Sequence, residues 1–200
     1  EKFAIFIGQV EGSSAALGAQ PFEVWVNGAE QPRGLGAIAK TLSMDMRSED
    51  RVWLKLKLDA LAKVHDENGF TIPMPPTGEP RFQNGVVAAF ANIVRWRCEQ
   101  LGVFQDPADQ LVPLPTPVMD ALFTRKEPRT GALGTMSWTV DVHNANTGDE
   151  FVLGVKELQL ADGSRRPYAL WLAGEYPKVL DGLCKLISLD MRVVDAHWIG

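Results

Sequence analysis

Two stretches of the chain decide the fold: PFEVWVNG at residues 21–28 and PYALWLAG at residues 167–174. Each precedes a longer stretch, PRGLGAIAKTLSMDMRSEDRVW at 32–53 and PKVLDGLCKLISLDMRVVDAHW at 177–198. The two copies are identical at 12 of their 30 aligned positions, whereas average composition would give about two by chance. Similarity of this length indicates that the chain contains an internal repeat.

Each copy changes from the spacing of a strand to the spacing of a helix. Residues 22–26 and 168–172 alternate between two faces, which is typical of a strand. The proline that follows each turn suits the first turn of a helix, and Asp50 and Asp195 suit the N-cap of a second helix. The apolar face of the first helix is expected at Leu35, Ile38, Leu42 and Met46 in one copy and at Leu180, Leu183, Ile187 and Met191 in the other.

The rest of the pattern predicts an α+β fold. Further strands are expected at residues 3–10, 138–143 and 151–160, an amphipathic helix at 86–101, and a proline-rich connection at 71–80. We expect two tandem repeats, 1–105 and 118–200, joined by a proline-rich linker at 106–117. Each repeat is predicted to be a small antiparallel sheet with helices packed on one face, and the two to be related by a pseudo-two-fold axis. The repeat pattern also predicts a strand before Glu1 and a truncated helix that continues after Gly200.

Composition excludes several classes of function. The chain has 200 residues, 20 Lys and Arg against 25 Asp and Glu, and a net charge of −5. A nucleic-acid-binding protein usually has a basic excess, and no apolar run approaches the roughly 18 residues of a membrane span. The two cysteines, Cys98 and Cys184, are 86 positions apart and lie in apolar helical patterns. We therefore expect no disulfide framework and a cytoplasmic location.

No catalytic or metal-binding motif is evident. The segment GLGAIA at 34–39 partly matches a dinucleotide-binding fingerprint, but the second copy has Asp181 where a pyrophosphate would lie. None of the three histidines, His65, His143 and His197, has a second ligand at helical or hairpin spacing, so no metal site is expected. We assign no catalytic residue.

The polar residues that the two copies share form the candidate site. Lys40, Ser43 and Arg47 fall on one flank of the first helix at 100° per residue. One interpretation is hydrogen bonding between the layers of the fold, and the other is a contact surface for an anion or a partner protein. Trp25 and Trp171 lie on the strand face opposite the apolar residues, where a further layer or a partner would cover them. In the second copy, the residues that align with Lys40, Ser43 and Arg47 are Lys185, Ser188 and Arg192.

The second copy, RRPYALWLAGEYPKVLDGLCKLISLDMRVVDAHWIG, resembles the TSCPD-type domain near the C-terminus of adenosylcobalamin-dependent ribonucleotide reductases. That domain has a strand of the type PxEVFI and a helix of the type ALGRLISLALR. The matching helix residues include Lys185, Ile187, Ser188 and Arg192, and residues 116–158 are similar to the small chain of reductases split into two polypeptides. The resemblance covers essentially the whole chain.

The resemblance implies an accessory role in deoxyribonucleotide synthesis. The reductase uses adenosylcobalamin to form a thiyl radical on its catalytic chain, and a cysteine pair supplies the electrons. Cys98 and Cys184 do not match that pair, and the cysteine-bearing motif that names the domain is absent. We therefore expect a non-catalytic accessory subunit whose partner is the catalytic chain, with no nucleic acid or membrane partner and no cofactor assigned to these residues. Two alternatives are a nucleotide- or anion-binding regulatory module and a purely structural assembly domain.

Overall fold

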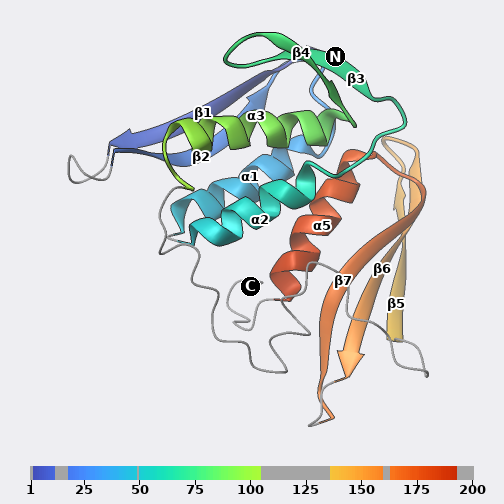
Figure 1. The fold of residues 1–200 in the computed structure, drawn as a ribbon. Helices are drawn as coiled ribbons and strands as arrows, with labels where there is room; N and C mark the ends of the chain where they lie inside the picture. Colours follow the sequence, from blue (N-terminus) through green and yellow to red (C-terminus); the bar gives the residue numbers. More distant parts are fainter. Residues whose placement is uncertain (1, 12–17, 49, 105–135, 160–162, 193–200) are drawn as a thin grey trace. The chain divides into compact units, whose positions relative to one another are not determined.

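The computed structural model describes residues 2–11, 18–48, 50–104, 136–159 and 163–192. The chain divides into two compact units, Glu1–Val112 and Pro113–Gly200. Both combine small antiparallel sheets with helices, so the predicted α+β class is confirmed (Figure 1). The linker predicted at 106–117 lies outside the described residues.

Unit 1 begins with a two-stranded sheet. Strand β1 (Ala4–Glu11) pairs antiparallel with β2 (Ala19–Asn27), and helix α1 (Leu35–Arg47) packs against β2. The predicted face of α1 is confirmed, because all four of its apolar residues are buried. Those residues are Leu35, Ile38, Leu42 and Met46.

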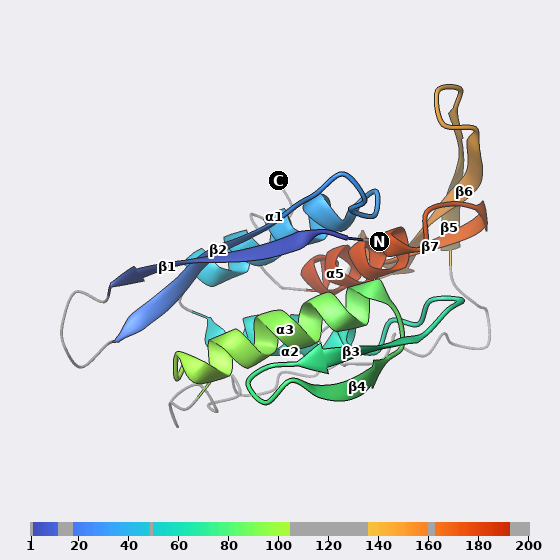
Figure 2. The same cartoon turned by 90° about the horizontal axis from the view of Figure 1, so that it is seen from above.

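Two further helices complete the core of unit 1. Helix α2 (Arg51–Leu61) has the predicted N-cap, since the Asp50 carboxylate accepts the Trp53 N–H at 2.8 Å. Helix α3 (Val86–Gln100) runs beside α2 and also contacts β1 and β2 (Figure 2). At the sheet, Arg97 Nη2 of α3 donates to Gln9 Oε1 of β1 at 2.7 Å.

The segment predicted as a proline-rich connection is instead a hairpin. Strand β3 (Phe70–Met74) pairs antiparallel with β4 (Glu79–Gln83). Its prolines are compatible with the ladder because Pro73 lies directly opposite Pro80. At every second pair of an antiparallel ladder, neither amide nitrogen faces the partner strand, so a proline there removes no hydrogen bond.

Unit 2 has a three-stranded sheet in the order β5-β6-β7. Its strands are β5 (Met136–Asn144), β6 (Asp149–Gln159) and β7 (Arg165–Glu175), and helix α5 (Val179–Met191) packs against β7. The predicted apolar face of α5 is not its buried face: Leu180, Leu183, Ile187 and Met191 are only half-buried, whereas Val179, Leu186 and Leu189 are buried. Helix α2, which contacts α1 in unit 1, has no counterpart among the described residues of unit 2. The predicted N-cap Asp195 and the helix after it lie outside the described residues.

The two strand pairs β1–β2 and β6–β7 share one irregularity. The register shifts by one residue between Gly8 and Gln9 in unit 1 and between Lys156 and Glu157 in unit 2. In both, the first residue beyond the shift lies opposite a proline, Pro21 or Pro167. A β-bulge at the same aligned position supports the interpretation of the units as copies of one motif.

Candidate functional site

The retained serine joins helix to strand in both units. In unit 1, Ser43 Oγ accepts the Val24 N–H at 2.9 Å, and its proton faces the Val24 carbonyl at 3.0 Å and the Ala39 carbonyl at 2.8 Å. In unit 2, Ser188 Oγ accepts the Leu170 N–H at 2.8 Å and donates to the Cys184 carbonyl at 2.6 Å. Both hydroxyls therefore bond the backbone of their own unit. This agrees with the interpretation that the two serines make hydrogen bonds between the layers of the fold.

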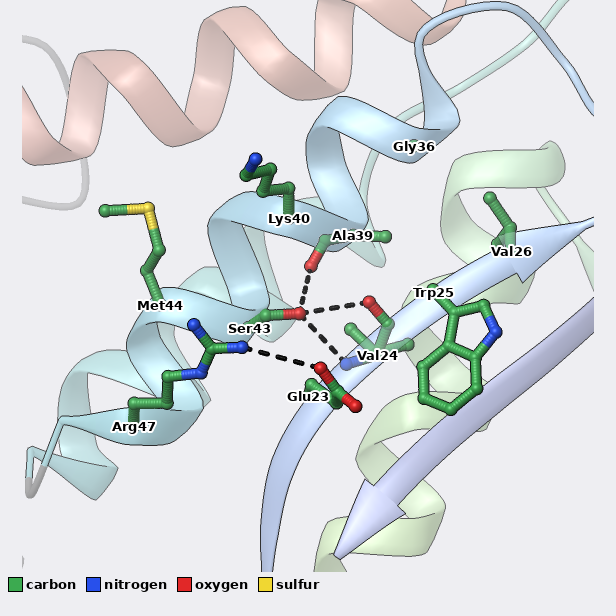
Figure 3. A pocket seen from close by; sticks show the side chains of 10 residues that line it. All are labelled: Glu23, Val24, Trp25, Val26, Gly36, Ala39, Lys40, Ser43, Met44 and Arg47. Carbon is green, nitrogen blue, oxygen red and sulfur yellow. Dashed lines mark hydrogen bonds and ion pairs between the residues drawn. The ribbon is translucent and has the colours of Figure 1, made fainter.

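A hollow of about 310 Å³ lies between β2 and α1 and brings together four of the predicted site residues (Figure 3). Strand residues 23–26 form one wall, and α1 forms the other. The predicted residues that line it are Trp25, Lys40, Ser43 and Arg47.

The charges of the hollow partly cancel. Arg47 Nη2 lies 3.4 Å from the Glu23 carboxylate, and its guanidinium stacks 4.6 Å above the Phe22 ring. Lys40 is exposed and makes no ion pair with any residue that the structure describes. An exposed pair such as Arg47–Glu23 is worth little in water, so Lys40 is the cation that the hollow offers to an anionic ligand.

The matching flank of unit 2 is built differently. Arg192 is buried, and its Nε donates to the Tyr168 carbonyl at 3.0 Å. Lys185 is exposed on α5. Arg192 therefore holds the end of α5 against β7, whereas its counterpart Arg47 lies at the surface. The two sets of retained residues do not form equivalent contact surfaces.

The two retained tryptophans also differ. Trp25 is 43% exposed and stacks on Phe6, which is 42% exposed, with the ring centroids 5.2 Å apart and the planes at 8°. Trp171 lies directly over Gly154, the residue opposite it on β6, and its Nε1 donates to Ser137 Oγ at 3.2 Å. Trp25 is presented to solvent, and Trp171 is half-buried on its own sheet.

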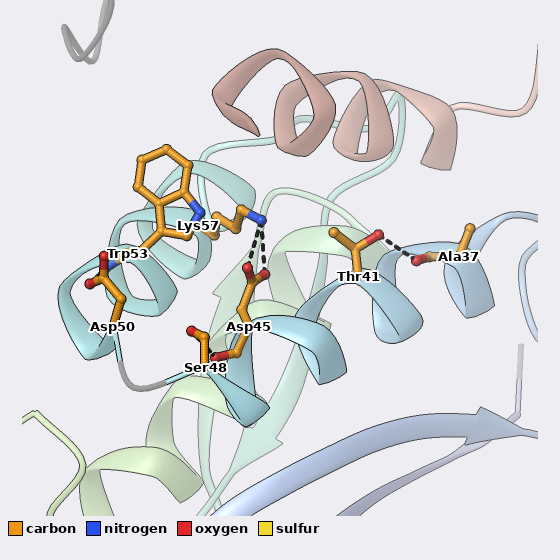
Figure 4. A network of polar contacts seen from close by, with 7 residues as sticks. All are labelled: Ala37, Thr41, Asp45, Ser48, Asp50, Trp53 and Lys57. Carbon is orange, nitrogen blue, oxygen red and sulfur yellow. Dashed lines mark hydrogen bonds and ion pairs between the residues drawn. The ribbon is translucent and has the colours of Figure 1, made fainter. Parts of the chain in front are cut away.

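A buried ion pair was missed by the sequence analysis. Lys57 Nζ of α2 donates to both carboxylate oxygens of Asp45 at 2.8 and 2.9 Å, and each side chain is only 1% exposed (Figure 4). The ammonium also lies 5.6 Å from the centre of the Trp53 ring. The one available signal was Asp45, which recurs in the second copy as Asp190. A lysine is rarely this buried unless it is paired. The ion pair with Asp45 therefore explains why Lys57 of α2 can be buried.

The described residues carry little nucleophilic or metal-binding chemistry. Burial raises the pKa of Cys98 to about 12 and that of Cys184 to about 11, so both thiols stay protonated at neutral pH. No group of three potential metal ligands occurs among the described residues, which exclude His197. The GLGAIA segment begins α1 after an antiparallel hairpin, without the parallel βαβ unit that a dinucleotide-binding site requires.

Comparison with known proteins found no matching family model, no similar curated protein and no similar solved structure. The resemblance to the reductase domain therefore depends on the sequence motifs alone. No helix in the described part of the chain is long and apolar enough to cross a membrane.

Proposed function

We propose that this chain is a non-catalytic accessory subunit or domain of an adenosylcobalamin-dependent ribonucleoside-diphosphate reductase in the cytoplasm, and that it docks on the catalytic chain. The observation that carries the proposal is the exposed, stacked pair of Phe6 and Trp25 on the outer side of the β1–β2 sheet. Adjacent exposed aromatic side chains are typical of the centre of a protein interface, where their burial contributes most of the binding energy.

The thiols support a non-catalytic role. A reductase that works through thiyl radicals and cysteine pairs needs accessible cysteines of low or normal pKa. The two cysteines of this chain are Cys98, which is buried, and Cys184, which is half-buried. The raised pKa of each favours an inert thiol.

The site residues do not fit a cobalamin. A hollow of about 310 Å³ is much smaller than a corrin ring with its nucleotide tail, and the described residues that line it include no histidine. We therefore assign adenosylcobalamin to the catalytic chain and derive no step of its chemistry from these residues.

The test is reductase activity of the catalytic chain with and without this chain, together with a binding measurement. We expect activity to rise when the chain is added, and Trp25→Ala to weaken the complex about tenfold or more, as for an interface anchor. Phe82→Ala is the matched control, because Phe82 is an exposed aromatic residue on a different strand, β4. Unchanged activity and no binding would contradict the proposal.

A second candidate, an anion- or nucleotide-binding regulatory module, is favoured by one observation: two cations, Lys40 and Arg47, line the same hollow. Calorimetry with a nucleoside diphosphate would then show binding that Lys40→Ala abolishes and Lys185→Ala preserves. Absence of heat would remove this candidate. A purely structural domain would bind the catalytic chain but no small molecule.

A further inference from the structure

Within the part of the chain that the structure describes, one edge of strand β5 is unpaired, and the strand carries exposed apolar side chains. It pairs with β6 alone among the described residues, and eight of its nine residues are exposed. Trp138 and Val140 are each 58% exposed. The strand contains no proline or lysine, and its register with β6 has no shift. It therefore lacks the proline, the lysine and the bulge that often prevent an edge strand from pairing.

The other outer strands of the two sheets are modified at their edges. The free edge of β2 is covered at Val24 by the Ser43 hydroxyl, and that of β7 at Leu170 by the Ser188 hydroxyl. The pairing of β1 with β2 shifts register after Gly8, where β2 contains the extra residue Phe22. Among the described residues, strand β5, in contrast to β2 and β7, has neither a covering hydroxyl nor a register shift along its length.

The register shows which backbone groups of β5 are available. Leu170 gives its N–H to Ser188, so its backbone faces away from β6. Leu170, Val155 and Trp138 lie opposite one another across the sheet. Because successive residues face alternate sides of a strand, the backbone of Trp138 faces β6, and the backbone of Thr139 faces the free edge. The groups of Ser137, Asp141 and His143 face the free edge for the same reason.

We propose that β5 is a homodimer interface, at which β5 of a second copy of this chain pairs antiparallel around a two-fold axis at Val140. This register uses all nine residues of the strand. It places Thr139 opposite Asp141 of the second copy and Ser137 opposite His143 of the second copy, so the free N–H and C=O groups form the ladder. Trp138 then lies opposite Val142 of the second copy, an aromatic and β-branched pair that stabilises sheets.

Self-complementarity of β5 favours a second copy as the occupant. The net charge of each chain is −5, yet β5 carries one acidic side chain, Asp141, and the proposed register places it opposite a threonine. No like charges face each other in this register, and like charges directly opposite would destabilise the pair. The contact is isologous, and its two-fold symmetry closes the assembly at a dimer. The interface is independent of the proposed function, since it uses neither Phe6 nor Trp25.

Cross-linking tests the register directly. Val140→Cys would place two thiols at a non-hydrogen-bonded pair on the axis, where the Cα atoms are close enough for a disulfide. His143→Cys is the matched control, because its two copies would be six positions out of register. With copper phenanthroline in the full chain, we expect a covalent dimer from Val140→Cys and a background level from His143→Cys and the unmodified protein. Equal cross-linking of the two variants would overturn the proposal.

Light scattering after size-exclusion chromatography tests the dimer itself. Thr139→Pro removes an amide that faces the free edge and leaves the β6 ladder intact, so this variant should remain folded and become monomeric. Thr139→Val should remain dimeric. Circular dichroism of both variants checks that the sheet is retained. A monomeric parent chain at 100 micromolar, or a dimer that Thr139→Pro leaves unchanged, would overturn the proposal.

Discussion

Ser43 on α1 contacts both backbone groups of Val24 on β2, its Oγ lying 2.9 Å from the amide nitrogen and 3.0 Å from the carbonyl oxygen. One hydroxyl thus replaces the neighbouring strand that β2 lacks on this side. Ser188 makes the equivalent contact with the Leu170 amide in unit 2. Both copies have a serine at this position because its hydroxyl binds a backbone amide at the free edge of the strand.

Removing this hydroxyl should therefore destabilise the fold. Ser43→Ala leaves the buried Val24 amide without its partner, which costs about 1–3 kcal/mol. Urea denaturation followed by circular dichroism measures the change. Thr41→Ala is the control, because the Thr41 hydroxyl bonds only the Ala37 carbonyl of its own helix and is partly exposed. Equal effects of the two substitutions would contradict the role assigned to Ser43.

The Asp45–Lys57 pair predicts a non-additive response. Asp45→Ala removes the carboxylate that accepts both hydrogen bonds of the buried Lys57 ammonium and should cost about 3–5 kcal/mol, whereas replacing both partners by apolar residues of similar size should be much less costly. The comparison is between the single variants Asp45→Leu and Lys57→Met and the double variant that combines them, measured by urea denaturation. If the double variant were as unstable as the sum of its single substitutions, the pair would not be coupled.

Cys98 predicts a loss of stability at alkaline pH. Burial raises its pKa from 9.0 to about 12. The unfolded chain therefore ionises first, and the contribution of the buried thiol is complete below pH 9 and is lost progressively as the pH rises to about 12. The slope from this one group is about 1.4 kcal/mol per pH unit within that interval. Cys98→Ala should reduce the pH dependence between 9 and 11, and an unchanged slope would contradict the assignment.

The retained arginines predict opposite results in the two units. Arg192→Ala removes a buried guanidinium that bonds the Tyr168 carbonyl, and a hydrogen bond to a charged group contributes about 1.5–3 kcal/mol. Arg47→Ala removes an exposed ion pair, which contributes about 0–1 kcal/mol. Thermal denaturation of both variants would separate them. A larger loss for Arg47→Ala would show that the surface arginine holds the fold.

Two glycines should respond oppositely to alanine. A Cβ at Gly154 would lie 2.0 Å from Trp171 Cε2, so the indole would have to move, and overpacking of this kind costs about 1–3 kcal/mol. A Cβ at Gly36, in the first turn of α1, would meet nothing within 4 Å, and alanine there should stabilise the helix by about 0.5–1 kcal/mol. Tryptophan fluorescence of Gly154→Ala should also change, and an unchanged spectrum would contradict the contact.

Much of the fold could be predicted because the repeat presents the same pattern twice. The apolar face of α1 and the Asp50 cap follow from local spacing, which depends on few neighbours. The β3–β4 hairpin could not be predicted from its prolines, since their compatibility depends on the partner strand. In α3 the helical spacing of 86–101 predicts a buried face that includes Ile93 and Arg97, but these two are only partly buried, whereas Ala91 and Cys98 are buried.

The candidate site was predicted less well. Helical angles correctly place Lys40, Ser43 and Arg47 on one flank, but they do not show which of these side chains face the strand. Lys57 was not identified, because in the sequence it resembles any lysine of an amphipathic helix and its carboxylate partner lies on another helix, 12 positions earlier. Such roles depend on tertiary contacts that periodicity does not encode.

The bulge that the two hairpins share determines where the chain can tolerate insertions and deletions. Both hairpins keep four positions between the proline and the tryptophan, Pro21 to Trp25 and Pro167 to Trp171, while the chain that joins their strands differs in length. A codon lost inside this interval would shift the register of β2 against β1, because the bulge places Pro21 opposite Gln9. Insertions should therefore be tolerated between the strands of each pair and rejected between the proline and the tryptophan.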